Sequence, residues 1–517
     1  MDEALSGPGP AAGADGGRRL TLPRRWAQLW ASEERKPVII DGAGGRVVTA
    51  GELEAASRSV ATGLAAAGLQ PGDRVLWRAG TGLLHVITAV GVLRAGYVLV
   101  PANPALTGRE LRHVVSDTAP AVFVLDPGTG PAPDLDRAVR VLDAGSLAAY
   151  RAGPAPASLD RSDASDGALI LFTSGTTGTP KGALHTHGSL LANAEALRAA
   201  WRWSPDDRLV HSLPLFHAHG LVVGLFCTLG AGASVVLLPR FGPTEVLDAV
   251  AGHRATLFFG VPTMYHRIAE SGRVGELSKL RLAVSGSAAL SADLHRAITE
   301  AGGPAILERY GTTETLMNLS NPYDGERRPG TVGLPLPGVE IRLEPGGELL
   351  VKAMSQFAGY WGRPDATAAA VSGGWYRTGD LASVDADGYV RILGRTKELV
   401  ISGGFNVYPA EVEAVLNEHP AVAESVVTGT PSAEWGEVVT AWIVPLAPDS
   451  PSAPERADLV GAVTEFAAAR LAPYKRPRIV HVVGSLPRNA LGKVQRHLLH
   501  EHHEHGPQAP PAGAPGD

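Results

Sequence analysis

The sequence predicts an α/β protein that has a large N-terminal domain with several sheets and a small C-terminal α+β domain. Three observations lead to this fold class. The chain has 517 residues, about two to four times a typical domain length. Short apolar runs end at Gly, Pro or Ser, which is typical of buried parallel strands. Ala-rich stretches with helical spacing separate these runs, as in βα units.

The elements of the large domain follow one another along the chain. We expect a helix at Gly51–Gly68, because its apolar residues recur at helical spacing. Strands are expected within Pro120–Pro127, Gly167–Gly175, Ala255–Pro262 and Leu280–Ser287. The apolar segment Leu221–Pro239 approaches the length of a membrane span, but glycines divide it. We therefore expect a buried helix, a turn and a buried strand there.

The pattern changes near Asp385. Asp387-Gly388 predicts a hairpin turn, and a helix at Pro409–Pro420 follows it. Strands are expected at Glu424–Pro431 and Val438–Pro445. These elements predict a large domain at 19–394 and a small domain at 395–500. The low-complexity ends, 1–18 and 501–517, are expected to be disordered.

Composition and charge exclude several classes of protein. Apolar residues make up 44% of the chain and charged residues 19%, so the chain can bury a core. The formal charge of −6 argues against general binding to nucleic acid or to anionic lipid. The one cysteine, Cys227, excludes an intrachain disulfide and is expected to be buried. No export signal is visible at the start, so we expect a cytoplasmic protein with neither nucleic acid nor membrane as partner.

The strongest local motif is LFTSGTTGTPKG at Leu171–Gly182, where a strand leads into a loop rich in Thr, Ser and Gly. Backbone N–H groups, hydroxyls and one ammonium group suit a polyphosphate. The motif is not a Walker A loop, because Pro180 precedes Lys181 and Gly182 follows it. The expected phosphate-binding residues are Thr173, Ser174, Gly175, Thr176, Thr177 and Lys181.

Five further segments follow in order: LPLFHAHG (213–220), ERYGTTET (308–315), YRTGD (376–380), GRTKELVISGGFNVYP (394–409) and PRNALGK (487–493). With the loop, they resemble the adenylate-forming enzymes, which include acyl-CoA synthetases, firefly luciferase and the adenylation domains of nonribosomal peptide synthetases. The resemblance covers roughly residues 20–500. It implies the adenylate-forming fold with a mobile C-terminal domain. It also implies that a carboxylate attacks ATP to form an acyl adenylate, which a thiol then takes up.

The resemblance implies roles for the nucleotide site. Glu314 would be the Mg²⁺ ligand, aided by Thr173, and Tyr310 would stack on adenine. The Asp380 carboxylate would accept hydrogen bonds from the ribose hydroxyls, and Arg395 would contact the nucleotide. The other expected nucleotide-binding residues are Ser287, Glu308, Arg309, Gly311, Thr312 and Thr313. An ordinary structural ion pair is the alternative for Asp380 and Arg395.

The resemblance also implies roles in catalysis. Lys493 would bridge the attacking carboxylate and the α-phosphate, and Lys397 would occupy the hinge. After rotation of the small domain, Ser402, Gly403 and Gly404 would replace Lys493 and let the pantetheine arm of coenzyme A pass. His217 would line the acyl pocket as a gate. His219 fits packing better than a role in the pocket.

The acid is indicated by a narrower resemblance, to malonyl-CoA and methylmalonyl-CoA synthetases, carried by GVPTMYHRIAE (260–270), VSGSAAL (284–290), ERYGTTETLMNLSNPYDGE (308–326) and GTVGLPLPGVE (330–340). It implies that Arg267 binds the second carboxylate of a small dicarboxylate, that Ser287 donates to the same group, and that Arg240 is the second candidate. Thr312 stands where these synthetases often carry Met, and Ala218 where Val is common. The exact acid therefore stays open.

Other acceptors and another class of function also stay open. Free coenzyme A is the simplest acceptor, and Lys475, Arg476 and Arg478 could meet its phosphates or form a solvated patch. An acyl-carrier protein thiol or another nucleophile is the alternative, with a different carboxylic acid. A non-catalytic nucleotide-binding or scaffold protein is disfavoured by Glu314, Asp380 and Lys493. The histidines of His497–His505 adjoin the tail, and no carboxylate or Cys spacing supports a closed metal site there.

Overall fold

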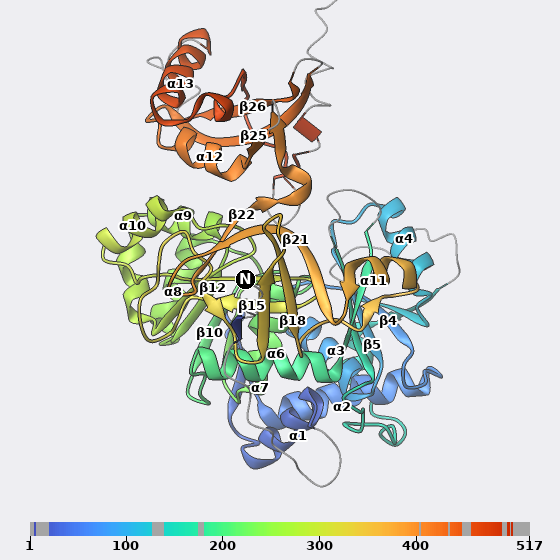
Figure 1. The fold of residues 1–517 in the computed structure, drawn as a ribbon. Coiled ribbons are helices and arrows are strands. Elements are labelled where there is room, and N and C mark those ends of the chain that lie inside the picture. The colour runs from blue at the N-terminus through green and yellow to red at the C-terminus, as the bar shows by residue number, and fades with distance from the viewer. Residues whose placement is uncertain are drawn as a thin grey trace, which may run out of the picture. The chain divides into compact units, whose positions relative to one another are not determined.

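A computed structural model of the chain describes residues 5–6, 20–126, 139–173, 180–402, 405–432, 435–446, 456–488, 494–496 and 498–499. These residues form two compact units. The large unit runs to Thr378 and includes Ser383–Arg391, and the small unit comprises Gly379–Ala382 and the chain from Ile392 onward. The joint expected at Arg395–Lys397 lies a few residues beyond this division. Figure 1 shows both units as ribbons.

One sheet of the large unit has the strand order β19-β9-β8-β5-β4-β6-β7. Its neighbours from β8 to β7 are parallel, whereas β9 and β19 add antiparallel strands at the edge that carries the phosphate-binding motif. The strands are β4 (Arg74–Arg78), β5 (Val98–Ala102), β6 (Val122–Leu125), β7 (Arg140–Asp143), β8 (Gly167–Phe172), β9 (Gly182–Thr186) and β19 (Gly359–Tyr360).

A second sheet has the order β16-β15-β14-β13-β12-β10-β11-β2-β3, with parallel pairing from β2 to β14. The strands expected within Ala255–Pro262 and Leu280–Ser287 are confirmed as β12 and β13. Its strands are β2 (Pro37–Asp41), β3 (Val47–Thr49), β10 (Arg208–His211), β11 (Ser234–Leu237), β12 (Leu257–Gly260), β13 (Leu282–Ser285), β14 (Leu307–Thr312), β15 (Leu316–Ser320) and β16 (Leu334–Pro335).

A third sheet has the order β1-β17-β18-β21-β20, and β22 pairs with β21. The predicted turn at Asp387-Gly388 is confirmed between β21 and β22. The strands are β1 (Leu5–Ser6), β17 (Val339–Leu343), β18 (Glu348–Ala353), β20 (Val371–Ser372), β21 (Trp375–Val384) and β22 (Val390–Arg395). The short strand β1 lies within the segment 1–18 for which the sequence predicted disorder. It pairs there because the edge strand β17 offers open backbone hydrogen-bonding groups.

Local capping chemistry sets the start of several helices of the large unit. Thr49 and Glu52 form a capping box at α2, and Thr107 and Glu110 form another at α4. The helix predicted at Gly51–Gly68 is thereby confirmed as α2. The helices are α1 (Leu22–Ser32), α2 (Ala50–Ala66), α3 (Leu83–Arg94), α4 (Gly108–Thr118), α5 (Ala144–Ala149), α6 (His187–Ala200), η2 (His219–Phe226), α7 (Cys227–Gly230), α8 (Pro243–Gly252), α9 (Pro262–Glu270), η3 (Val274–Lys279), α10 (Ala292–Glu300) and α11 (Pro364–Ala370).

The apolar segment Leu221–Pro239 has the predicted form of a buried helix, a turn and a buried strand. Its helical part is the π-helix η2 followed by α7, and its strand is β11. Cys227 is buried as expected, and burial raises the pKa of its thiol. Among the described residues, no helix has both the length and the apolar character needed to span a membrane.

The small unit has a sheet of order β24-β23-β26-β25, with β27 beside β26. The predicted helix and the two predicted strands are confirmed as α12, β25 and β26. Its elements are η4 (Thr396–Glu398), β23 (Val400–Ser402), β24 (Phe405–Val407), α12 (Pro409–Asn417), β25 (Val422–Ser432), β26 (Gly436–Pro445), α13 (Arg456–Arg470), η5 (Pro473–Lys475) and β27 (Ile479–Val482).

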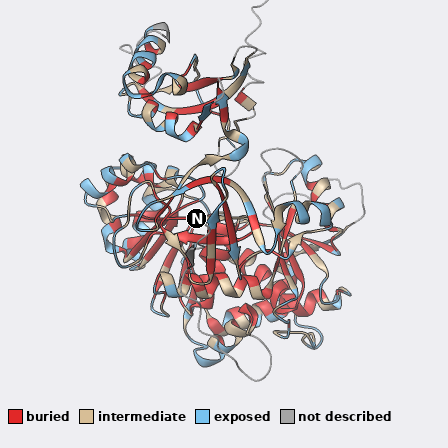
Figure 2. Cartoon of the chain, viewed as in Figure 1, coloured by how far each residue is buried: buried red, intermediate tan, exposed pale blue. Residues whose placement is uncertain are grey.

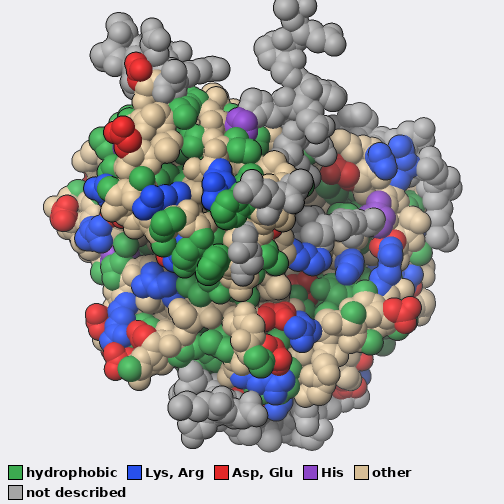
Figure 3. Space-filling model, turned by 45° about the horizontal axis from the view of Figure 1, so that its top comes forward, with side chains coloured by type: hydrophobic (Ala, Val, Ile, Leu, Met, Phe, Trp, Pro, Cys, Tyr) green, Lys and Arg blue, Asp and Glu red, His purple; other side chains and the backbone are tan. Residues whose placement is uncertain are grey.

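The buried residues lie mainly on the strands of the sheets. Figure 2 shows buried residues concentrated along the strands and exposed residues on the outer faces of helices. In the small unit, Val412 and Leu416 of α12 pack with Val463 of α13 in one buried cluster. On the face drawn in Figure 3, basic side chains are interspersed with acidic and apolar ones.

Candidate active site

The phosphate-binding motif begins where β8 ends. The backbone N–H of Thr173 donates to the carbonyl oxygen of Lys181 at 2.9 Å, and the N–H of Lys181 lies 3.4 Å from the Thr173 hydroxyl. These bonds close the base of the loop. The Lys181 ammonium lies 5.0 Å from the ring centroid of Tyr360. Ser174, Gly175, Thr176 and Thr177 lie outside the described residues.

The ERYGTTET segment forms the end of β14 and the tight connection to β15. A Cβ atom on Gly311 would lie 1.9 Å from the carbonyl oxygen of Leu316, so only glycine fits this turn. Thr312 and Thr315 share a hydroxyl–hydroxyl hydrogen bond of 2.8 Å, and the carbonyl oxygen of Thr313 accepts from His185 Nε2 at 2.7 Å. Tyr310 is half-buried beside these residues in β14.

Glu314 is 7% exposed, and its Oε1 accepts a 2.7 Å hydrogen bond from the Tyr360 hydroxyl. Within the described ranges, no three His, Cys, Asp or Glu side chains gather in a way that could hold a metal ion. Mg²⁺ commonly uses only one or two carboxylates together with phosphate oxygens and water. A single buried carboxylate beside the loop lysine therefore fits Mg²⁺ that arrives with a nucleotide.

Glu308 and Arg309 are both buried at the base of this segment. Glu308 Oε1 accepts from the N–H of Leu290 at 2.9 Å, and burial raises the pKa of Glu308 to about 8. Burial lowers the pKa of Arg309 to about 9. Its Nε and Nη2 have no hydrogen-bond partner among the described residues. A buried guanidinium without its full set of partners is a strong candidate for binding an anion.

Two histidines and a serine lie near Arg309. The Ser287 hydroxyl is 3.3 Å from His219 Nδ1, and the N–H of His219 is 3.3 Å from His217 Nδ1. Burial and the nearby Arg309 hold the pKa of His219 well below its usual value. Ser287 is exposed and has a φ of 71°, a strained conformation that is concentrated at functional sites. These residues therefore include one exposed side chain, Ser287, and two buried ones, His219 and Arg309.

The two arginines expected to bind the acid are both exposed. Arg267 is exposed on α9, and its guanidinium lies over the Phe241 ring at 5.2 Å from the centroid. Arg240 is exposed after β11. Neither side chain has the burial that makes Arg309 a strong candidate. A role for Arg267 or Arg240 in binding the acid therefore has no support from burial.

The small unit contains the other residues that were expected to bind the nucleotide, Asp380 and Arg395. Asp380 is 6% exposed, and its Oδ1 lies 3.2 Å from Arg395 Nε. Lys397 is exposed in η4, and the neighbouring Thr396 hydroxyl donates to the Gly379 carbonyl oxygen at 3.1 Å. Ser402 is buried at the end of β23. Gly403, Gly404 and Lys493 lie outside the described residues, as do the histidines of His497–His505.

The small unit also presents aromatic and basic side chains together. The rings of Phe405 and Tyr474 stack at 4.8 Å with an interplanar angle of 26°. Arg478 lies over the Trp435 ring at 3.8 Å, and Lys475 pairs with Glu411. Stacked rings beside cations suit a nucleotide. The cations stand together in one sequence motif, whereas stacking between distant segments leaves no spacing signal for the aromatic partners.

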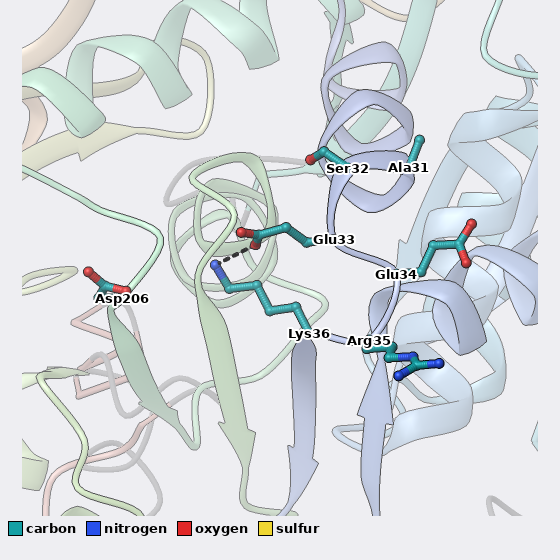
Figure 4. Close-up of a pocket in the computed structure, with 7 residues that line it drawn as sticks. All are labelled: Ala31, Ser32, Glu33, Glu34, Arg35, Lys36 and Asp206. Carbon is teal, nitrogen blue, oxygen red and sulfur yellow. Dashed lines mark ion pairs between the residues drawn. The ribbon is translucent and has the colours of Figure 1, made fainter.

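The pocket drawn in Figure 4 belongs to another part of the large unit. It lies between the end of α1 and the start of β2, and the Lys36 ammonium pairs with Glu33 at 3.0 Å. Its lining residues are Ala31, Ser32, Glu33, Glu34, Arg35, Lys36 and Asp206. None of them belongs to a motif that the sequence singled out.

Comparisons with known proteins agree with this arrangement of motifs. The profile of the AMP-binding enzyme family matches residues 26–361, and that of the AMP-binding enzyme C-terminal domain matches residues 411–493. The chain is 36% identical over 471 residues to a feruloyl-CoA synthase of an Amycolatopsis species, which covers 87% of this chain and 93% of that protein. It is 38% identical over 405 residues to the mitochondrial malonate–CoA ligase of Bos taurus, covering 69% of this chain and 68% of that protein.

Solved structures of acyl-CoA ligases are also similar to this chain. The crystal structure of ATP-bound MatB from Rhodopseudomonas palustris matches with a TM-score of 0.85 and 39% identity, over 93% of this chain and 99% of that one. A malonyl-CoA ligase with methylmalonyl-CoA and AMP bound matches with a TM-score of 0.65 and 43% identity, over 88% and 97% of the two chains. The chain therefore belongs to the AMP-binding enzyme family and, within it, to the adenylate-forming acyl-CoA ligases.

Proposed function

We propose that the protein is an ATP-dependent ligase that activates a small dicarboxylate, malonate or methylmalonate, as its acyl adenylate and transfers the acyl group to coenzyme A. One observation carries the choice of acid. A buried guanidinium, that of Arg309, has N–H groups without a partner among the described residues and lies in the set that contains Ser287 and His219.

The Arg309 guanidinium would meet the acid through these N–H groups. Burial raises the pKa of its sequence neighbour Glu308, which favours the neutral form of that carboxyl group. A monocarboxylate uses its one carboxylate for attack on ATP and would leave Arg309 unpaired. A dicarboxylate has a second carboxylate, which can accept two parallel hydrogen bonds from a guanidinium.

This proposal moves the role of acid-binding residue from Arg267 and Arg240 to Arg309. Ser287 keeps the expected role, since its hydroxyl is close to His219 and could donate to the same carboxylate. An aromatic acid such as ferulate has no second carboxylate for the buried cation. The presence of a feruloyl-CoA synthase among the relatives makes ferulate the main competing acid.

The nucleotide-binding residues would be those of the phosphate-binding loop and of the motifs that the family resemblance singled out. Lys181 and the loop residues from Thr173 to Thr177 would bind phosphate oxygens, Tyr310 would face adenine, and Asp380 would accept from the ribose hydroxyls. Bound Mg²⁺, held by Glu314 with the Thr173 hydroxyl, would neutralise phosphate charge. Lys493 would bring an ammonium to the α-phosphate during the first step.

Coenzyme A would bind to residues of the small unit. Its nucleotide could stack against the surface formed by Phe405 and Tyr474, with Arg476 and Arg478 near its phosphates. Ser402, Gly403 and Gly404 would border the path of the thiol in the second step, with Lys397 at the hinge between the two steps.

A panel of acids tests the proposal. AMP and CoA thioester are measured together with malonate, methylmalonate, propionate, octanoate and ferulate. The proposal predicts that both products appear, fastest with malonate or methylmalonate. Fastest turnover of ferulate or octanoate would contradict the choice of acid. AMP without thioester would point instead to a carrier-protein thiol or another acceptor.

A further inference from the structure

We propose that Tyr360 is a positioning residue. It would fix the position of the Glu314 carboxylate, which would bind Mg²⁺, relative to the Lys181 ammonium, so that both groups can bind the polyphosphate. The inference rests on the proposed use of ATP and Mg²⁺. It concerns a tyrosine that lies 46 residues from Glu314 in the sequence and outside the motif of either group.

The first link is a hydrogen bond. The Tyr360 hydroxyl donates to Glu314 Oε1 at 2.7 Å. The buried Tyr376 interacts electrostatically with both groups, and burial together with the nearby Glu314 raises its pKa. Because Glu314 is almost fully buried, this bond fixes the direction of its carboxylate. None of the described residues forms a hydrogen bond to Oε2, which remains for a cation.

The second link is the ring face of the same tyrosine. The Lys181 ammonium lies 5.0 Å from the Tyr360 ring centroid, which favours a cation over the ring. One aromatic side chain thus contacts the anionic and the cationic group that the polyphosphate needs. A change in its position would move both groups together.

The backbone around Tyr360 reinforces these contacts. Tyr360 pairs with Ala183 in β9, and the N–H of Trp361 donates to the Gly182 carbonyl oxygen at 2.8 Å. The N–H of Phe357 donates to the carbonyl oxygen of Glu314 at 2.7 Å. The five residues from Phe357 to Trp361 therefore tie the Glu314 segment to the strand that leaves the phosphate-binding loop.

Aromatic packing holds the tyrosine in place. The Phe357 ring makes edge contacts with Tyr360 at 4.9 Å and with Tyr376 at 5.7 Å. Phe357 and Tyr376 are buried together with Ala183. Replacing Tyr360 by Phe would therefore keep the ring, its packing and its contact with Lys181, and would remove only the bond to Glu314.

The test uses the full chain and Mn²⁺ as a spectroscopic substitute for Mg²⁺. Electron paramagnetic resonance measures Mn²⁺ bound to the protein with ATP, and calorimetry measures ATP binding without metal. The variants are Tyr360→Phe, Tyr360→Leu and Tyr376→Phe. Tyr389→Phe is the matched control, because the Tyr389 hydroxyl donates to a backbone carbonyl oxygen, that of Glu326, at 2.8 Å.

Tyr360→Phe should weaken Mn²⁺ binding roughly 10-fold, the loss typical of removing a partner that orients a metal ligand. Metal-free ATP binding should stay unchanged in this variant. Tyr360→Leu should also weaken metal-free ATP binding by about 3-fold, because Lys181 loses the ring. Tyr376→Phe should weaken Mn²⁺ binding less than Tyr360→Phe, and Tyr389→Phe should match the wild type.

Wild-type Mn²⁺ binding in Tyr360→Phe would overturn the inference. So would an equal loss of ATP binding with and without metal in Tyr360→Phe, since that pattern indicates general damage. These outcomes are distinct from failure of the proposed function, in which the wild-type protein itself would bind no Mn²⁺ with ATP.

Discussion

The guanidinium carbon of Arg309 occupies the space beside Gly286, where a Cβ atom on the glycine would lie only 2.3 Å away. Any larger residue at position 286 would therefore displace Arg309. Gly286 immediately precedes Ser287, whose backbone is strained. The position of the Arg309 side chain on β14 therefore depends on the absence of a side chain at Gly286, in the loop after β13.

Gly286→Ala should therefore impair recognition of the acid more than folding. The added methyl group would push Arg309 from its position, and overpacking of this kind costs about 1–3 kcal/mol in stability. We expect KM for malonate to rise while KM for ATP changes little. Thermal unfolding and steady-state kinetics measure both effects.

Gly252→Ala is the matched control, because a Cβ atom on Gly252 meets nothing within 4 Å. It should change the unfolding free energy by less than about 0.5 kcal/mol. An unchanged KM for malonate in Gly286→Ala, equal to that of Gly252→Ala, would show that Arg309 is not held by this contact.

Lys493→Ala should separate the two half-reactions. The family resemblance gives Lys493 the role of stabilising charge at the α-phosphate, an effect worth about 3–4 kcal/mol per donor. Pyrophosphate exchange should fall at least about 100-fold, whereas CoA thioester formation from a supplied acyl adenylate should be largely spared. Equal damage to both half-reactions would argue against rotation of the small domain.

Tyr474→Ala should raise KM for coenzyme A. Removing one ring of the Phe405–Tyr474 stack takes away about 1–3 kcal/mol of base stacking, or roughly a 10-fold change in KM. KM for ATP should stay as in the wild type. If KM for coenzyme A also stayed unchanged, the nucleotide of coenzyme A would have to bind elsewhere.

Stability should fall as the pH is lowered from 6.5 toward 4. Burial lowers the pKa values of His185, His187 and His211 to about 4 in the folded protein. The unfolded chain therefore takes up protons first, and each histidine costs up to about 1.4 kcal/mol per pH unit in this window. Glu308 acts in the opposite sense, because its folded pKa is raised to about 8. The three histidines together contribute more to the pH dependence of the unfolding free energy than the one carboxyl group of Glu308, so the net stability falls.

Denaturant unfolding of wild type and His187→Gln at pH 7 and pH 5 measures this effect. The substitution should reduce the pH dependence by about one histidine's contribution, since neither ring nitrogen of His187 has a hydrogen-bond partner among the described residues. The same slope in both proteins would mean that His187 does not stay neutral when folded.

The sequence predicted much of the fold, because strand ends and helix faces are local signals. The apolar run at Leu280–Ser287 and the Ala-rich stretch at Gly51–Gly68 correspond to β13 and α2. The strand β1 was missed, because pairing with the distant β17 is set by an open sheet edge and not by the composition of the segment itself.

The candidate site was only partly predictable for a related reason. Motifs located Glu314 and Lys181, but they do not show that Tyr360 contacts both. Arg309 stood in a quoted motif as an expected nucleotide-binding residue, but its burial could not be read from residue type. The role of Arg267 rests on the narrower resemblance and stays a prediction; its exposure on α9 depends on helix packing, which the motif does not show.

The most direct test of the account is the ratio of kcat/KM for malonate to that for propionate, in wild type, Arg309→Met and Arg267→Ala. Propionate has a single carboxylate and a similar carbon chain. Arg309→Met should lower the ratio roughly 100-fold, because a buried charge pair typically contributes 2–5 kcal/mol. Arg267→Ala should keep the wild-type ratio. An unchanged ratio in Arg309→Met, or a selective loss in Arg267→Ala, would contradict the account.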